Sequence, residues 1–276
     1  MTEHSYPNTQ SKKKGIFFFM MKARATKPGE TYGVPGQGDT LWLSVLSILG
    51  IIFVWWLFTF MGWVKPLFLP SPQSVLKKFF DVLNNGFTNT SFMGHVGISA
   101  ARVFGAFLLA CLVGIPLGLA MGMSPVVRGI FDPPIEFYRP IPPLAYLPLM
   151  IIWFGIGETS KVLLIFLSVL APVALGARSG VKSAAIEQIH AAYSFGASRW
   201  QVMRHVILPS ALPEILTAMR IGIGFGWTTL VAAEMVAATS GLGYMVLSAS
   251  QFLQTSTVIM GIVVIAIIAY AFDMLM

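Results

Sequence analysis

The chain contains several apolar runs that are long enough to cross a lipid bilayer, and these runs limit what it can fold into. Residues 41–60 form an uninterrupted apolar run of about the 20 residues that a membrane helix needs. Inside a bilayer the backbone polar groups must bond within the segment, so such runs become helices. With 56% hydrophobic and only 11% charged residues, the chain is more apolar than soluble domains are. The sequence therefore predicts an all-α, polytopic membrane protein.

We predict six membrane spans. They cover residues 41–60, 98–121, 131–154, 162–177, 214–236 and 258–276. Lysines before the first span place the N-terminal tail, residues 1–39, in the cytoplasm under the positive-inside rule. Arg178, Lys182, Arg199 and Arg204 place the segment after the fourth span on the same side. Residues 40–276 then form one transmembrane domain with a long cytoplasmic segment at about 183–209.

The second and third spans carry unusual glycine and proline patterns. Glycines at 114, 118 and 122 recur every four residues, which predicts a flat face that another helix approaches closely. Six prolines interrupt residues 131–154, and such backbone survives at membrane depth only where protein or a water-filled cavity satisfies it. Glu136 and Arg139 lie three residues apart in this segment. They either line a substrate path or form an ion pair at the inner surface without a transport role.

The fifth span contains polar side chains near its middle. Trp227, Thr228 and Thr229 are candidates for the same path. The alternative is that both threonines are buried and bond the carbonyls of their own helix. The glycines at 222, 224 and 226 predict further close helix packing.

Residues 187–213 are polar and strongly patterned, although they lie between two apolar runs. Apolar residues at helical spacing from 186 to 193 predict a short amphipathic helix. Gly196 is suited to the left-handed conformation that ends a helix, and Ser198 with Gln201 forms a capping-box pattern that starts another. We expect Pro209 to end that second helix. This pattern predicts two short helices joined at a glycine, outside the lipid.

Several other function classes lack the residues that they need. The histidines at 95, 190 and 205 are far apart in sequence, and no metal-ligand cluster or pair of nucleophile and base is present. Residues 155–161 lack the Gly-Lys-Ser/Thr ending of a nucleotide-binding loop, and no clustered basic patch outside the tail indicates nucleic acid. An intramembrane enzyme would need Glu136, Arg139 and Glu234 to face one cavity. An ion-coupled transporter would need inverted repeats, and none is convincing.

The segment between the fourth and fifth spans resembles the signature of the permease subunits of bacterial ATP-binding-cassette importers. That signature reads Glu-Ala-Ala, three residues, Gly, nine residues, and a hydrophobic region ending in Leu-Pro. In this sequence His190 stands where the family most often has an acid, and Glu187, one turn earlier, shares its helix face. The resemblance implies contact with the ATPase for Glu187, His190, Ala191, Ala192, Gly196, Ala197, Leu208 and Pro209.

Two further segments, FYRPIPPLAYLPLMIIWFGIGETSKVLL and TLVAAEMVAATSGLGYMV, are similar to the taurine, aliphatic sulfonate and nitrate subgroup, and to taurine permeases in particular. This implies the type I importer permease fold in a bacterial inner membrane. It also implies a dimer of this subunit, two separate ATPase subunits that hold ATP and magnesium, and an external binding protein that delivers substrate. The chain itself would then be no enzyme and would bind no cofactor. We expect taurine as substrate, with another sulfonate or nitrate as the alternative.

Overall fold

The computed structural model describes residues 41–275, so the predicted tail, residues 1–39, lies outside the described part. This part is helical and contains no β-strand, which confirms the all-α prediction. By internal contacts the chain divides into Met1–Ile51 and Ile52–Met276. The elements are α2 Leu41–Phe60, α3 Pro72–Asn85, α4 Phe92–Met123, α5 Pro125–Tyr138, α6 Pro143–Phe154, α7 Glu158–Gly180, the 3₁₀ turn η1 Val181–Ser183, α8 Ile186–Ser194, α9 Arg199–Val202, the π-helical turn η2 Met203–Ile207, α10 Leu208–Ala237, α11 Leu242–Gln251 and α12 Thr255–Leu275.

Five helical segments in the described residues are long and apolar enough to cross a membrane. They are Trp42–Phe60, Phe92–Met123, Glu158–Ser183, Arg199–Ala237 and Thr255–Leu275. The predicted third span, residues 131–154, is not one helix, because α5 ends at Tyr138 and α6 begins at Pro143. The break falls among Pro140, Pro142 and Pro143, which have no backbone N–H and bias the residues before them away from the helical region.

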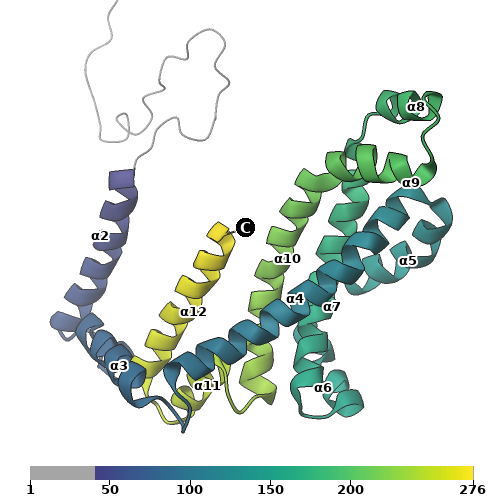
Figure 1. The fold of residues 1–276 in the computed structure, drawn as a ribbon. Helices are drawn as coiled ribbons and strands as arrows, with labels where there is room; N and C mark the ends of the chain where they lie inside the picture. The colour runs from purple at the N-terminus through teal and green to yellow at the C-terminus, as the bar shows by residue number, and fades with distance from the viewer. Residues whose placement is uncertain (1–40, 276) are drawn as a thin grey trace, which may run out of the picture. The chain divides into compact units, whose positions relative to one another are not determined.

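The helices α4, α7 and α10 run side by side and form the centre of the fold (Figure 1). A Cβ atom added at Gly118 of α4 would lie 2.2 Å from the carbonyl oxygen of Ala174 in α7, so only glycine allows this approach. The two other glycines of the predicted stripe, 114 and 122, also face α7 or the turn after it. Gly222 and Gly226 of α10 face α7 in the same way, whereas Gly224 faces open space, where the close-packing prediction is wrong.

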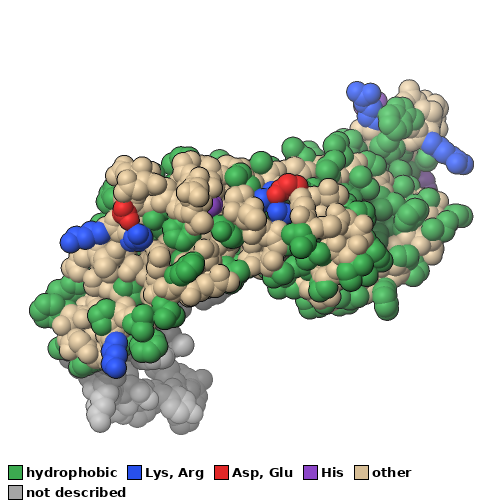
Figure 2. Space-filling model, turned by 90° about the horizontal axis from the view of Figure 1, so that it is seen from below, with side chains coloured by type: hydrophobic (Ala, Val, Ile, Leu, Met, Phe, Trp, Pro, Cys, Tyr) green, Lys and Arg blue, Asp and Glu red, His purple; other side chains and the backbone are tan. Residues whose placement is uncertain are grey.

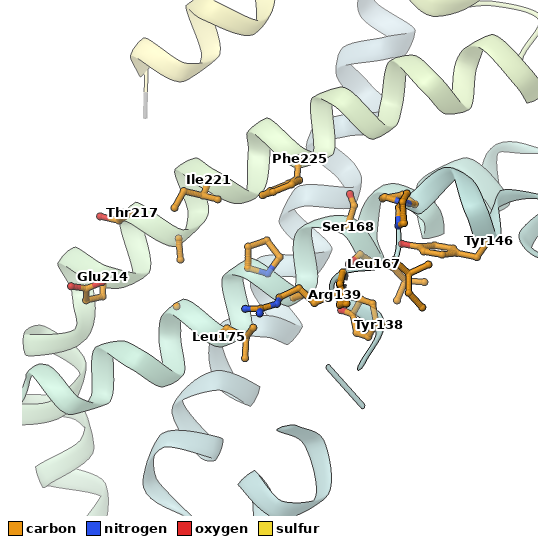
Figure 3. Close-up of a pocket in the computed structure, with 18 residues that line it drawn as sticks. Tyr138, Arg139, Tyr146, Leu167, Ser168, Leu175, Glu214, Thr217, Ile221 and Phe225 are labelled. Carbon is orange, nitrogen blue, oxygen red and sulfur yellow. Dashed lines mark hydrogen bonds between the residues drawn. The ribbon is translucent and has the colours of Figure 1, made fainter. Parts of the chain in front are cut away.

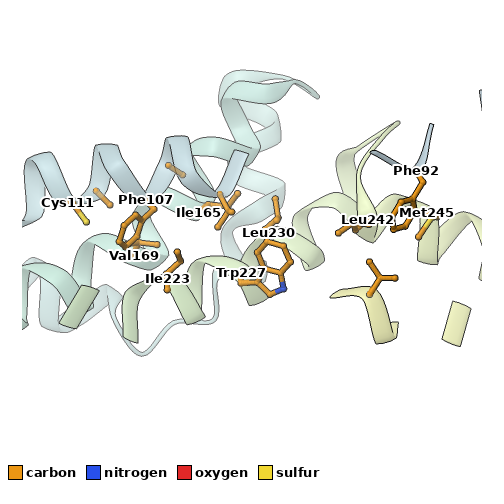
Figure 4. Close-up of a cluster of buried hydrophobic side chains, with 14 of the residues drawn as sticks. Phe92, Phe107, Cys111, Ile165, Val169, Ile223, Trp227, Leu230, Leu242 and Met245 are labelled. Atoms are coloured by element: carbon orange, nitrogen blue, oxygen red, sulfur yellow. The ribbon is translucent and has the colours of Figure 1, made fainter. Parts of the chain in front are cut away.

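The middle parts of these three helices enclose an apolar core (Figure 4). Phe107 from α4, Ile165 and Val169 from α7, and Leu230 from α10 are all buried in it. Trp227 lies among them with 7% of its surface exposed. The core therefore holds the three helices together at mid-length and leaves their two ends to be fixed by other contacts.

Candidate functional site

The segment that carries the importer-like signature begins with α8, which ends as the glycine predicts. Gly196 adopts a φ of +83°, in the left-handed region that side chains rarely enter. Its N–H donates to the carbonyl of Tyr193 at 2.9 Å, and the N–H of Ala197 donates to the carbonyl of Ala192 at 3.0 Å. These two bonds form a Schellman motif, which satisfies carbonyls that the helix end would otherwise leave free. The glycine elbow is thus confirmed.

The capping box that follows is also confirmed. The N–H of Ser198 donates to Oε1 of Gln201 at 2.7 Å, and the N–H of Gln201 donates to Oγ of Ser198 at 3.4 Å. The prediction that Pro209 ends this helix is wrong, because the backbone stays helical from Arg199 to Ala237. The π turn η2 explains the difference. There Leu208 N–H bonds the carbonyl of Met203, and a wider turn relieves the clash of a proline ring with the preceding turn.

Most of α8 has no partner within the described chain. Its side chains at Glu187, His190 and Ala191 are exposed, and the residues Gly196 and Pro209 beyond it are exposed as well. Half-buried positions are those of Ala192, Ala197 and Leu208, the first two above a small core of Ala184, Val202 and Ile207. Two large aromatic side chains beside the elbow are exposed, Phe195 at 91% and Trp200 at 64%. A shallow pocket of about 320 Å³ lies between α8 and α9.

Four charged side chains meet near the junction of α5 and α7, and we call them the inner cluster. Arg178 of α7 forms ion pairs with Asp132 and, at 3.6 Å, with Glu136 of α5. Glu136 also pairs with Arg139 at 3.2 Å, so these two predicted residues do come together. All four side chains keep between 24% and 56% of their surface exposed. The sequence did not predict Asp132 and Arg178 as site residues. They are 46 residues apart on different helices, so their spacing gives no sign that they pair.

A second group of two acids and two bases lies at the other end of α7, and we call it the outer cluster. Arg102 of α4 donates from Nε and Nη2 to Glu158 of α7, both at 2.6 Å, and from Nη1 to Glu234 of α10 at 2.7 Å. Lys161 completes the group by donating to Glu158 at 2.8 Å. The face of the molecule in Figure 2 carries few charged side chains; red and blue atoms adjoin one another near its middle, while other blue side chains have no red neighbour.

Glu234 is the best satisfied acid in the outer cluster, although none of its surface is exposed. Besides Arg102, it accepts hydrogen bonds from Oγ of Ser99 at 2.8 Å and from the N–H of Gly243 at 2.9 Å. Glu234 therefore joins α4 and α10 to the start of α11. Glu136 and Arg139 belong to the inner cluster at the opposite end of α7, so the structure does not bring together the three residues that an intramembrane enzyme would need.

A cavity of about 620 Å³ lies between α7, α10 and the break between α5 and α6 (Figure 3). The proline-interrupted segment thus lines a cavity, as the sequence predicts. Of the proposed path residues only Arg139 lines it, and Glu136 forms an ion pair with Arg139. Trp227 and Thr229 are buried, whereas Thr228 is exposed and donates to the carbonyl of Gly224 at 3.1 Å. Their role in transport stays a prediction.

Comparisons with known proteins agree with this geometry. Residues 114–276 match the family model described as the binding-protein-dependent transport system inner membrane component. The chain is 56% identical over 233 residues to the taurine transport system permease protein TauC of Escherichia coli (strain K12), covering 84% of this chain and 85% of that protein. It is 33% identical over 261 residues to the putative aliphatic sulfonates transport permease protein SsuC of Bacillus subtilis (strain 168), covering 92% and 93%.

The fold also has a solved counterpart. The inward-facing MetNI methionine ABC transporter contains a chain that aligns with a TM-score of 0.55 at 19% identity, over 66% of this chain and 92% of that one. At this identity the likeness shows the fold alone, which is that of a type I importer permease. The sequence relatives, the matched family and the membrane helices together identify the chain as a multi-pass inner-membrane transport permease that belongs to the family of binding-protein-dependent transport system inner membrane components.

Proposed function

We propose that this permease imports taurine, driven by ATP hydrolysis in a separate subunit and supplied by an external binding protein. The observation that carries the substrate assignment is the 56% identity to a taurine permease, which extends over 84% of the chain. The cavity supports it, because a sulfonate is a permanent anion and Arg139 places a guanidinium in the cavity wall. Other sulfonates or nitrate are the alternative substrates.

We further propose that α8 and the elbow after it dock on the ATPase. The Schellman motif closes the C-terminal end of α8, and the exposed side chains of this helix leave room for a partner. The segment after the elbow is continuous through η2 with α10, which forms one wall of the cavity. A displacement of the docked segment would thus be transmitted to the cavity wall through one continuous helix. The exposed side chains of His190 and Glu187 offer polar contacts to the ATPase on this surface.

The assembly that follows contains two copies of this chain and two ATPase subunits, with ATP and magnesium bound by the ATPases. We propose that α8 and the N-terminus face the cytoplasm. Arg128, Arg178, Lys182, Arg199 and Arg204 all lie at the α8 end of their helices or in the segment next to it, in accord with the positive-inside rule. Lipid surrounds the remaining apolar surface.

Reconstituted uptake tests the substrate assignment. Vesicles containing the permease and its ATPase, with the binding protein outside and ATP inside, are given radiolabelled taurine, an alkanesulfonate or nitrate. We expect ATP-dependent accumulation of taurine above that of the other two. Uptake of only nitrate or only alkanesulfonate would reject taurine as the substrate, and uptake that persists without the ATPase would reject the importer mechanism.

The docking surface is tested at its most exposed aromatic side chain. Phe195→Ala should weaken ATPase binding about 10- to 30-fold, because buried aromatic contacts dominate interfaces and Phe195 is 91% exposed among the described residues. Phe252→Ala is the matched control, since Phe252 is 72% exposed and follows α11, away from α8. Affinity is measured by titrating purified ATPase onto the permease in nanodiscs. Equal binding by both variants would contradict docking at the elbow.

A further inference from the structure

We infer that the 620 Å³ cavity is a transit site for a zwitterion that has a sulfonate at one end and an ammonium at the other. Arg139 would bind the sulfonate, and Glu214 would bind the ammonium. This inference rests on the proposed import of taurine and deepens it by placing the substrate within the chain. Arg139 and Glu214 are the two charged side chains that residues 41–275 contribute to the lining of this cavity.

Arg139 has donors to spare for an anion. One terminal nitrogen, Nη2, lies 3.2 Å from Glu136, and 56% of the side chain is exposed. A guanidinium carries five N–H donors in a planar fork that matches an oxyanion. Glu136 has Arg178 as a second partner at 3.6 Å, so it keeps another cation beside it when Arg139 also binds an anion. Figure 3 shows the Arg139 side chain beside Tyr138, overlapping the α7 ribbon in this view, and the cavity-lining residues of α10 on a separate ribbon.

Glu214 supplies the opposite charge in the same cavity. It is exposed near the beginning of α10 and forms no ion pair with any residue between 41 and 275. One turn on, Oγ1 of Thr217 donates to the carbonyl of Pro213 at 2.9 Å, which leaves its lone pairs as acceptors. On α7, Pro172 has no N–H, so the carbonyl of Ser168 lacks its helical donor. This wall therefore offers acceptors, as an ammonium group requires.

The pairing of an acid and a base in one apolar cavity discriminates between ligand types. Ile141, Leu167, Ile221 and Phe225 make much of the wall apolar, so a ligand that fills the cavity displaces water from both charged groups. A charge left with neither water nor a partner is costly. A ligand with only a sulfonate satisfies Arg139 but leaves Glu214 without a partner. A zwitterion satisfies both and adds no net charge. Short methylene groups between its two ends would lie against the apolar wall.

The position of the cavity assigns the site to one stage of transport. Its walls come from residues 167–176 of α7 and 214–225 of α10, the halves of these helices that lead to and from α8. The site thus lies on the side of the core next to the coupling segment. A substrate that reaches it has already passed the level of the outer cluster.

Direct binding to the complete permease–ATPase complex tests the site. The complex in nanodiscs, without the binding protein, is titrated with taurine and with ethanesulfonate, which lacks the ammonium. We expect Glu214→Gln to weaken taurine binding about tenfold and to leave ethanesulfonate binding unchanged or stronger, as loss of one charged hydrogen bond predicts. Arg139→Gln should weaken both ligands about tenfold, and Arg139→Lys should restore part of the loss. Asp81→Asn, an exposed acid on α3, is the control.

Two outcomes would overturn the inference. One is that wild type binds no taurine in this assay. The other is that Glu214→Gln changes taurine and ethanesulfonate binding equally or not at all. Taurine uptake by wild-type vesicles separates failure of the site from failure of the proposed function. If wild type takes up taurine but the variants bind both ligands as wild type does, only the site is rejected. Absence of wild-type taurine uptake rejects the substrate itself.

Discussion

The outer and inner clusters have the same composition and opposite surroundings. Each contains two acids and two bases, and each lies at one end of α7. In the outer cluster Arg102, Lys161 and Glu234 are at most 5% exposed and only Glu158 reaches the surface, at 61%, whereas every side chain of the inner cluster is at least 24% exposed. We infer that the desolvated ion pairs of the outer cluster are costly to break and hold their helices in place. The more exposed pairs of the inner cluster can break and form again at little cost.

The two clusters also join different numbers of elements. The outer cluster ties α4, α7 and α10 together and holds the connection to α11, where Nη1 of Arg102 donates to the carbonyl of Ser240 at 2.7 Å. Among residues 41–275, the ion pairs of the inner cluster join α5 to α7 alone, and the cluster lies beside the cavity. We therefore expect the outer end of the three-helix core to stay fixed when the inner end opens and closes.

Removal of the buried acid should have the largest effect. Glu234→Ala leaves Arg102 with one carboxylate and removes the acceptor from Ser99 and the Gly243 N–H. Breaking a buried ion pair costs about 3–5 kcal/mol, and we expect a loss of that size in the free energy of unfolding in mixed detergent micelles. Glu234→Gln, which keeps an oxygen acceptor, should lose less. A loss below about 1 kcal/mol for the alanine variant would show that the outer cluster does not hold the three helices together.

The corresponding change in the inner cluster should be much smaller. Arg178→Ala removes partners from Asp132 and Glu136, but water reaches both acids and Glu136 keeps Arg139. We expect a loss of about 1 kcal/mol in the same unfolding assay, as for other solvated ion pairs. Higher ionic strength should shrink this loss, because exposed charges are screened. A loss as large as that of Glu234→Ala would remove the contrast between the two ends.

Local signals in the sequence predicted the elements around the coupling segment. Gly196, and Ser198 with Gln201, act over distances of at most a few residues, and both predictions were confirmed. The apolar runs and the glycines facing α7 were equally local in origin. The prediction that Pro209 ends a helix was wrong because the geometry of the turn before it could not be read from the sequence. Whether a proline ends a helix depends on the preceding turn, and the π turn η2 has no clear sequence pattern.

The functional clusters depend on contacts that sequence spacing does not reveal. Arg102 and Glu234 are 132 residues apart, and Glu158 is 56 residues from Arg102. A sequence motif cannot report that three different helices converge at one end. Glu214 was missed as a site residue for the same reason, because its importance comes from the cavity that α7 and the α5–α6 break complete. Glu136 and Arg139 were found because one helical turn separates them.

An exposed pair outside the membrane helices sets the lower limit of the comparison. Lys78 donates to Asp81 at 2.6 Å on α3, and their side chains are 33% and 48% exposed. This hydrogen bond, and then that of Asn85, lower the pKa of Asp81. A lowered pKa means that the pair stabilises the fold above the ordinary pKa of the carboxyl and loses that effect as the pH falls through the lowered value.

Asp81→Asn should therefore have the smallest effect. At pH 7 the wild-type pair is charged, but water and salt screen it, so we expect no measurable shift in Tm. At pH 3 the carboxyl is closer to protonation, and any difference between wild type and variant should shrink further. Thermal unfolding of both proteins at the two pH values checks this. A shift at pH 7 equal to that of Arg178→Ala would mean that ion pairing itself, and not the degree of burial, sets the strength of these contacts, and the distinction between a fixed outer end and an adjustable inner end would lose its physical basis.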